Sequence, residues 1–343
     1  MLSKYAISRF LSHRFLPRFV RHLGGLTPLE KFEKLRKLCC TSERAANLKM
    51  PAIDYDGSRG ESEDEPCLPD PLLDIRNKNV LLLGGGSGIG YETSKALLDE
   101  GVMRIIIADI DRISGTSVVK KLCDAYGPGK AFFILTDIRE QPSIEMAFRE
   151  IYKRFNEITI YVNMVGVYNE TPQCWDKMLQ TNLYGCIRGM LLAYKYLSQY
   201  PPGTPNPTSV IVNLSSYGAI ANVPTMPIFS AAANGVHGLT SSFGQDFHYN
   251  KTKVRCLTVC ASCTDNGLLR NMDRHHYDNR WVKHSAKLIK CCTKQSSAIV
   301  GRAIYTAIKY GLNGSVYVIK EGKYYRFVMP SYTKLMHQET ILL

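Results

Sequence analysis

The chain has 343 residues, enough for one large domain with an extension or for two modest domains. Hydrophobic residues make up 45% of it and charged residues 21%, which is typical of globular proteins and excludes a fibrous or wholly disordered chain. No apolar run approaches the roughly 20 residues that span a bilayer. The 11 cysteines follow no even spacing, and a chain of this length does not depend on disulfides, so we expect a reducing compartment.

The net charge of +13 is unevenly distributed along the chain. Residues 1–50 carry +8, residues 51–75 carry −7, and the remaining 268 residues carry +12. The middle segment contains several prolines and glycines but no hydrophobic periodicity, which predicts a solvated acidic linker. We therefore divide the chain into a basic N-terminal extension (1–50), the linker (51–75), a globular domain (76–330) and a C-terminal tail (331–343).

The basic extension has no acidic residue before Glu30. On a helix, Arg14, Arg18 and Arg21 share one face and apolar side chains share the other. An acid-free, arginine-rich, amphipathic start is typical of a mitochondrial presequence, although Pro17 interrupts the helix and serines are few. A membrane-surface helix and an unstructured extension are the alternatives. We expect a mitochondrial location, with the cytoplasm as the alternative.

A glycine-rich loop follows the first apolar run of the globular domain. Residues 80–83 predict a strand, residues 84–90 include five glycines, a helical pattern comes next, and residues 104–109 predict a second strand. Glycines let the backbone approach a pyrophosphate at a helix N-terminus, and an acid after the second strand can accept hydrogen bonds from ribose hydroxyls. That acid, Asp109, would repel a 2′-phosphate, so the predicted cofactor is NAD rather than NADP. A glycine-rich turn in a ligand-free βαβ unit is the alternative.

Further apolar runs alternate with helical stretches along the rest of the domain. They are residues 131–136, 159–163, 209–213, 254–260 and 315–319. Seven strands alternating with helices predict a single α/β domain with a doubly wound, parallel, seven-stranded Rossmann sheet.

The motifs of residues 76–330 resemble those of the short-chain dehydrogenase/reductase family, in particular its 15-hydroxyprostaglandin dehydrogenases and insect alcohol dehydrogenases. The family's Thr-Gly-x-x-x-Gly-x-Gly loop matches residues 83–90 with the threonine lost, and its Asn-Asn-Ala-Gly element matches residues 163–166. Asp137 matches the acid that contacts adenine, and Asn182 matches the asparagine of the fourth helix. The dinucleotide-binding residues that the resemblance implies are Gly84, Ser87, Gly88, Ile89, Gly90, Asp109, Asp137, Ile138, Asn163 and Gly166.

The catalytic element departs from the family pattern. Ser216 matches the serine that bonds the substrate carbonyl, but Phe229 stands thirteen residues later where the family has tyrosine, and Ala233 stands where it has lysine. In the family the tyrosine moves the hydroxyl proton, and the lysine lowers the pKa of that tyrosine and holds the nicotinamide ribose. Only Asn182 and Ser216 are left as a catalytic remnant.

Other tyrosines do not restore the motif. Tyr-x-x-x-Lys occurs four times, but none of the four directly follows the strand that carries Ser216: two precede it, one precedes the sixth strand and one lies on the last helix. Tyr217 adjoins Ser216, but on a strand its side chain points to the opposite face, so we expect it not to replace the missing hydroxyl. The family's Pro-Gly pair after the sixth strand is also absent, with Ala261 and Ser262 in its place.

The cysteines give weaker signals. Cys260 and Cys263 form one Cys-x-x-Cys without a second pair or a nearby histidine, which favours buried thiols over a zinc site. The vicinal pairs at 39–40 and 291–292 lie in basic surroundings, where a lowered thiol pKa is the alternative to ordinary thiols.

A basic stretch, residues 270–294, carries seven Lys or Arg against two Asp. The resemblance places the substrate lid here, and a basic lid would suit an anionic lipid or acyl ligand, with a solvated charged face as the alternative. Aromatic residues interleave with these charges, but no nucleic-acid motif accompanies them, so we expect no specific nucleic-acid partner.

Three functions stay open. The pattern favours a catalytically impaired family member, a homo-oligomer that binds NAD and serves as a regulator or scaffold. The first alternative is an active NAD-dependent alcohol or hydroxy-lipid dehydrogenase whose proton relay runs through Ser216, Asn182 and water. The second is a basic-surface binding protein that uses the dinucleotide fold only as a scaffold.

Overall fold

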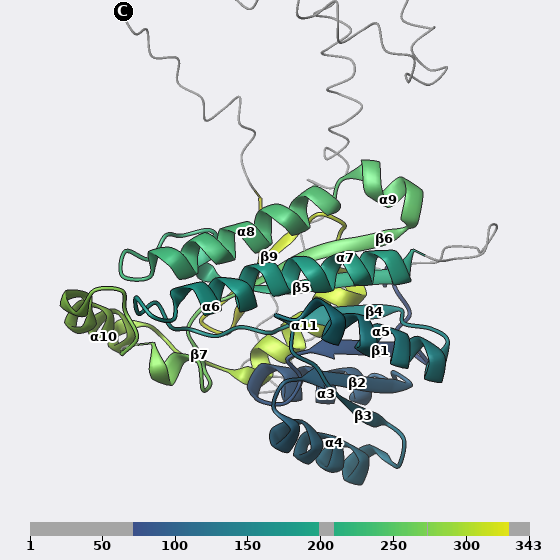
Figure 1. Ribbon diagram of the computed structural model, residues 1–343. Coiled ribbons are helices and arrows are strands. Elements are labelled where there is room, and N and C mark those ends of the chain that lie inside the picture. The colour runs from purple at the N-terminus through teal and green to yellow at the C-terminus, as the bar shows by residue number, and fades with distance from the viewer. Residues whose placement is uncertain (1–70, 199–208, 273, 329–343) are drawn as a thin grey trace, which may run out of the picture. The chain divides into compact units, whose positions relative to one another are not determined.

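The computed structural model describes residues 71–198, 209–272 and 274–328 (Figure 1). The predicted basic extension, nearly all of the acidic linker and the C-terminal tail lie outside these residues. The predicted presequence and the domain boundaries therefore stay predictions.

Eight strands of the described residues form one sheet in the order β10-β9-β6-β5-β4-β1-β2-β3. They are β1 (Asn79–Leu83), β2 (Arg104–Asp109), β3 (Ala131–Leu135), β4 (Ile160–Asn163), β5 (Ser209–Ser216), β6 (Val254–Ala261), β9 (Val316–Lys320) and β10 (Lys323–Phe327). From β1 the chain proceeds through β2 to β3 at one edge, and from β4 through β5, β6 and β9 toward the other. The strand order thus reverses between β1 and β4, where open α/β sheets bind ligands.

Helices cover both faces of the sheet, because alternate strand residues point to opposite sides. Val80 and Leu82 pack in one core with α3 (Gly88–Asp99), α4 (Arg112–Tyr126) and α11 (Ser297–Tyr310). Leu81 and Leu83 pack in a second core with α5 (Gln141–Phe155) and α7 (Cys186–Leu197). Figure 1 shows α7 and α8 (Pro227–Phe243) on the side opposite α3 and α4.

Shorter elements surround the carboxyl ends of the strands. They are α6 (Trp175–Leu179), a π-helix η3 (Gln180–Gly185), α10 (Val282–Cys291), and the 3₁₀ turns η4 (Tyr217–Ala219), η5 (Leu269–Asn271) and η6 (Asn279–Trp281). Helix α9 (Asp246–Thr252) lies at the other end of the sheet, directly before β6. Strands β7 (Thr264–Asp265) and β8 (Gln295–Ser296) pair in parallel and bring the two ends of the 266–294 segment together. Among the described residues, no helix is long and apolar enough to cross a membrane.

The prediction of a doubly wound, mostly parallel α/β sheet is confirmed. The sheet has one strand more than predicted, because β10 returns antiparallel beside β9. Glu321 and Gly322, with φ of +55° and +78°, form the tight turn between the two strands. The strand that carries Ser216 also extends three residues beyond the predicted end at Asn213.

Candidate functional site

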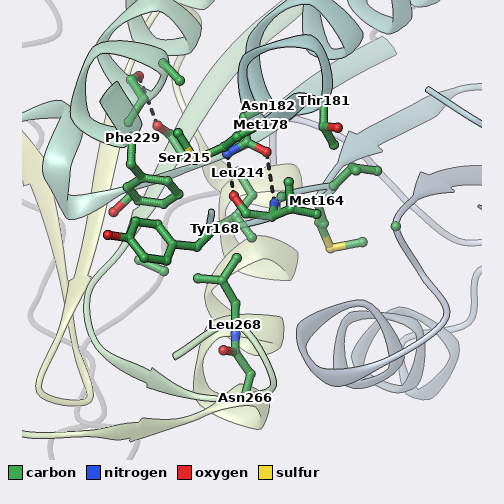
Figure 2. A pocket seen from close by; sticks show the side chains of 18 of the residues that line it. Met164, Tyr168, Met178, Thr181, Asn182, Leu214, Ser215, Phe229, Asn266 and Leu268 are labelled. Atoms are coloured by element: carbon green, nitrogen blue, oxygen red, sulfur yellow. Dashed lines mark hydrogen bonds between the residues drawn. The ribbon is translucent and has the colours of Figure 1, made fainter. Parts of the chain in front are cut away.

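A cavity of about 1250 Å³ lies at the carboxyl ends of the central strands (Figure 2). Its wall begins at the glycine loop after β1, passes the ends of β2, β4, β5 and β6, and reaches α10. This volume exceeds the ~300–1,000 Å³ of common ligand pockets. The cavity is therefore large enough for a ligand that consists of two chemically different parts.

The glycine loop forms one end of the cavity and lies against the backbone of neighbouring elements. Gly84 has a φ of +80°, and a Cβ there would lie 2.9 Å from the Val165 nitrogen. Gly90 lies in the first turn of α3, where a Cβ would lie 2.5 Å from the Gly84 carbonyl oxygen. Because backbone atoms cannot rotate away as a side chain can, both positions require glycine.

The N-terminus of α3 points its first N–H groups toward this end of the cavity. Ser87 is the N-cap residue, and its side chain makes no capping hydrogen bond to the helix. Ser87, Gly88 and Ile89 all line the cavity. The partial positive charge of the helix end and its N–H groups, which lack a side-chain cap, fit a phosphate group.

Asp109 ends β2 beside the glycine loop, as the sequence predicts. Its Oδ2 accepts a hydrogen bond from the Gly86 N–H at 2.9 Å, and its Oδ1 accepts one from the Asp111 N–H at 3.0 Å. These bonds fix the carboxylate at the cavity wall. Each carboxylate oxygen still has a lone pair with which to accept a ribose hydroxyl.

Asp137 and Ile138 follow β3 and line the cavity next to Asp109. The Arg139 Nη2 lies 2.6 Å from the Asp137 Oδ2, and this hydrogen-bonded pair lowers the pKa of Asp137. Arg139 also lines the cavity, and Arg188 donates to its carbonyl oxygen at 2.7 Å. This end of the cavity therefore offers an adenine an ion pair rather than a lone carboxylate.

Asn182 holds the loop that follows β4. It lies in the π-helix η3, accepts the Val167 N–H at 2.9 Å and donates to the Val167 carbonyl oxygen at 2.8 Å (Figure 2). These bonds keep Gly166 and Val167 in the cavity wall. Asn163 does not line the cavity: it is 2% exposed and supports the same loop by accepting the Val165 N–H at 3.2 Å.

Ser216, Phe229 and Ala233 meet on one wall of the cavity. Ser216 ends β5, and its Oγ accepts the Gly218 N–H at 3.2 Å. Phe229 lies in the first turn of α8, and Ala233 follows one turn later with 7% of its surface exposed. The structure thus brings together the predicted serine and the two substituted positions, which supply neither a hydroxyl nor an ammonium group.

The prediction that Tyr217 lies on a strand is wrong, whereas the prediction that it does not replace the missing hydroxyl stays a prediction. We expected a strand residue facing away from Ser216, but β5 ends at Ser216 and Tyr217 begins the 3₁₀ turn η4. The Ser216 side chain caps this turn, so the alternation of strand side chains stops there and Tyr217 lines the cavity. The Lys320 Nζ lies 5.6 Å from the centre of its ring.

Glu170 is a buried carboxyl group behind the cavity wall that sequence reasoning missed. It is fully buried, and its Oε1 accepts the Phe229 N–H at 2.5 Å at the start of α8. Burial raises the pKa of Glu170 to about 7, although the N–H groups of Phe229 and Ile228 oppose the rise. Its Oε2 has no hydrogen-bond partner among the described residues.

Tyr168 and His276 connect the cavity wall to the segment before α10. The Tyr168 hydroxyl lies 2.8 Å from the His276 Nδ1, which is also 3.1 Å from the Thr225 carbonyl oxygen. The Tyr168 ring meets the edge of Phe229 with ring centres 5.7 Å apart, and Figure 2 shows the two rings side by side. Burial and the nearby Glu170 raise the pKa of Tyr168, so this hydroxyl keeps its proton.

The far end of the cavity is apolar. Its wall includes Met178, Val223, Met226, Leu268, Leu269, Met272, Leu288 and Ile289. Leu288 and Ile289 belong to α10, whose lysines are exposed to solvent on the outside. The predicted lid therefore has an apolar inner side and a basic outer side.

The two ends of the cavity suit different chemistry. The glycine loop, the N-terminus of α3 and Asp109 fit a dinucleotide, whereas the side chains of Phe229 and Ala233 carry neither a hydroxyl nor an ammonium group. No cluster of three or more His, Cys, Asp or Glu side chains suited to a metal occurs within the described part of the chain. Fold and site define a dinucleotide-binding α/β protein of the oxidoreductase type.

Comparisons with known proteins agree with this class. The short chain dehydrogenase family model matches residues 78–276. Rat 15-hydroxyprostaglandin dehydrogenase [NAD(+)] is 27% identical over 76% of this chain and 99% of the relative, and alcohol dehydrogenase 1 of Ceratitis cosyra is 25% identical over 73% and 94%. The fold is similar to that of Brucella melitensis 3-ketoacyl-(acyl-carrier-protein) reductase complexed with NADH, with a TM-score of 0.61, 19% identity, and 72% and 98% coverage. The chain belongs to the short-chain dehydrogenase family.

Proposed function

We propose that this protein binds NAD(H) but is catalytically impaired, and that it acts as a regulator or scaffold. The observation that carries the proposal is the position of Phe229 and Ala233 on the cavity wall beside Ser216. General acid–base groups contribute about 10²–10⁴-fold to such reactions, and Phe229 has no proton to transfer. The side chain of Asn182 is engaged with Val167, and the Ser216 oxygen accepts from Gly218.

The preferred cofactor in this proposal is NAD(H) rather than NADP(H). Asp109 is fixed beside the glycine loop, where it would accept ribose hydroxyls and repel a 2′-phosphate. Arg139 is the nearby cation, and it is paired with Asp137. Asp109→Ala should weaken NADH binding by more than it weakens NADPH binding, measured by fluorescence titration of both. Equal affinities of the unchanged protein for the two cofactors would remove the preference.

Restoring the missing groups tests the impairment. Phe229→Tyr with Ala233→Lys should gain measurable NAD-dependent turnover of secondary alcohols, and either substitution alone should gain little, because proton transfer and ribose positioning act on one step. Phe229→Leu is the matched control and should stay at background.

The active dehydrogenase with an alternative relay is the competing outcome. Robust turnover by the unchanged protein that is kept in Phe229→Leu and lost in Ser216→Ala would overturn the proposal of impaired catalysis and establish that relay. That relay runs through Ser216, Asn182 and water, and Tyr168 and Tyr217 are further hydroxyl groups on the cavity wall.

The remaining parts of the proposal concern ligand, assembly and location. The apolar end of the cavity below the basic α10 supports an anionic lipid or acyl ligand, with a solvated charged face as the alternative. We also propose a homo-oligomer in mitochondria, with the cytoplasm as the alternative location. Sedimentation of the purified protein tests the homo-oligomer, and a reporter fused to residues 1–25 tests the mitochondrial location. A monomer, or a reporter that stays in the cytosol, would contradict them.

A further inference from the structure

We propose that Cys263 and Cys292 form a redox-sensitive pair on the cavity wall, a modification site for thiol–disulfide exchange with a small organic disulfide such as oxidised glutathione. Cys263 follows β6, and Cys292 ends α10 as its C-cap residue. The two lie 29 positions apart in the chain. Both are free thiols that are half-buried, and both line the cavity.

Backbone hydrogen bonds bring together the two chain segments that carry these cysteines. Strand β7 begins at Thr264, directly after Cys263, and Thr264 pairs in parallel with Gln295 of β8. The Gln295 N–H also donates to the Cys263 carbonyl oxygen at 3.0 Å. Gln295, three residues after Cys292, is thereby held against the backbone of Cys263, independently of any contact between the side chains.

The side chains complete the contact. Cys263 and Ile289 of α10 pack against the same apolar cluster, and the Cys292 Sγ lies 3.1 Å from the Ile289 carbonyl oxygen. The Cys292 thiol is close enough to Cys263 to influence its ionisation. Burial and this neighbour raise the pKa of Cys263 to about 12, while Lys294 opposes the rise. Cys263 therefore stays a thiol until its partner has reacted.

The neighbouring cysteines on β6 and at the end of α10 do not share this environment. Cys256 and Cys260 are fully buried on β6, and burial raises the pKa of each thiol to about 12. Cys291, the immediate neighbour of Cys292, is exposed and does not line the cavity. Cys291 is thus a matched control: it has nearly the same sequence position but does not face Cys263.

The exchange balances in two steps. The Cys292 thiolate attacks one sulfur of the organic disulfide, which forms a mixed disulfide and releases one thiolate that takes up a proton. Cys263 then loses its proton and attacks the Cys292 sulfur, which forms the internal disulfide and releases the second small thiol. Overall, two protein thiols are oxidised by two electrons and one small disulfide is reduced to two thiols.

A disulfide bond between Cys263 and Cys292 would hold α10 at the cavity. The segment 266–294 begins after β7, forms η5, η6 and α10, and ends at β8, so a bond between Cys263 and Cys292 closes a covalent loop around most of it. Leu288 and Ile289 would then be tied to the wall that carries Ser262 and Cys263. Opening of α10 away from the cavity would require reduction of the bond.

The test uses the full chain in glutathione buffers from fully reduced to fully oxidised, followed by alkylation and tryptic digestion. The expected product joins the peptide 256–270 to the peptide 291–294. Its mass is two hydrogens below the sum of the two peptides with Cys263 and Cys292 as free thiols and the other three cysteines alkylated. It should form in the unchanged protein and in Cys291→Ser, and be lost in Cys292→Ser and Cys263→Ser. Hydrogen exchange of the α10 amides should slow at least several-fold when the bond forms.

Two results would overturn the inference. One is absence of the linked peptide from the oxidised unchanged protein, which does not depend on how any variant folds. The other is a linked peptide that persists in Cys263→Ser or is lost in Cys291→Ser. The peptide mass is read whether or not NADH binds, so failure here is distinct from failure of the proposed function.

Discussion

Replacing Gly90 with alanine should damage the dinucleotide end of the cavity. The new Cβ would lie 2.5 Å from the Gly84 carbonyl oxygen and 2.6 Å from the Gly85 Cα. Both are backbone atoms, so the loop must move away from α3. Overpacking of this kind typically costs about 1–3 kcal/mol. Because the loop and the helix N-terminus would hold the pyrophosphate together, a comparable loss in binding corresponds to a roughly tenfold or greater rise in the Kd for NADH.

Gly238→Ala is the matched control for this substitution. Gly238 lies in α8, and a Cβ there would meet no heavy atom within 4 Å. Alanine in an exposed helical position should stabilise the protein by about 0.5–1 kcal/mol and leave NADH binding unchanged. NADH fluorescence titration and thermal unfolding of the two variants provide the comparison. Unchanged affinity and unchanged Tm in Gly90→Ala would refute the account of the loop.

Two further predictions concern Glu170 and Tyr168, which both contact Phe229. The pKa of Glu170 is raised from 4.5 to about 7, so its contribution to stability is complete below pH 4.5 and is lost as the pH rises through 7, by about 3 kcal/mol. Denaturant unfolding at pH 5 and pH 8 should show a smaller decrease for Glu170→Gln, and an equal decrease in both proteins would contradict the burial of this carboxyl. Tyr168→Phe removes the hydroxyl 2.8 Å from the His276 Nδ1 and should lower the free energy of unfolding by about 1 kcal/mol. No change in the same unfolding assay would show that this hydrogen bond contributes nothing.

The parts of the fold that depend on local sequence were predictable. Short runs of β-branched and aliphatic residues mark the buried strands, because a strand covered on both faces needs no polar alternation. The glycine loop was predictable from the spacing of its glycines after an apolar run, although only part of the close packing is local: a Cβ at Gly90 would meet Gly84, whereas a Cβ at Gly84 would meet Val165.

Boundaries and edges were harder to predict. Tyr217 was assigned to a strand because it adjoins Ser216, whereas in the structure the Ser216 Oγ accepts the Gly218 N–H and the strand ends there. Strand β10 is amphipathic and lies at the sheet edge, so it lacks the apolar run that marks the central strands. The Glu321–Gly322 turn before it was the available signal.

Contacts between distant residues were not predictable from one sequence. Tyr168 meets His276 and Glu170 meets Phe229 only because the loop after β4, the start of α8 and the segment before α10 fold together. The ion pair between Asp137 and Arg139 joins residues two positions apart, but the family resemblance implied only that Asp137 contacts adenine and said nothing of Arg139. Buried polar partners of this kind depend on tertiary geometry rather than on spacing.

The central claim is that dinucleotide binding and turnover have separated in this chain. The most direct test titrates one purified sample with NADH and then incubates the same sample with NAD⁺ and a panel of secondary alcohols and 15-hydroxy lipids, following NADH formation. The account predicts a saturable NADH isotherm that is weakened by Gly90→Ala, together with NADH formation at background. Saturable binding with robust NADH formation would contradict the impairment, and absence of NADH binding would contradict the cofactor site.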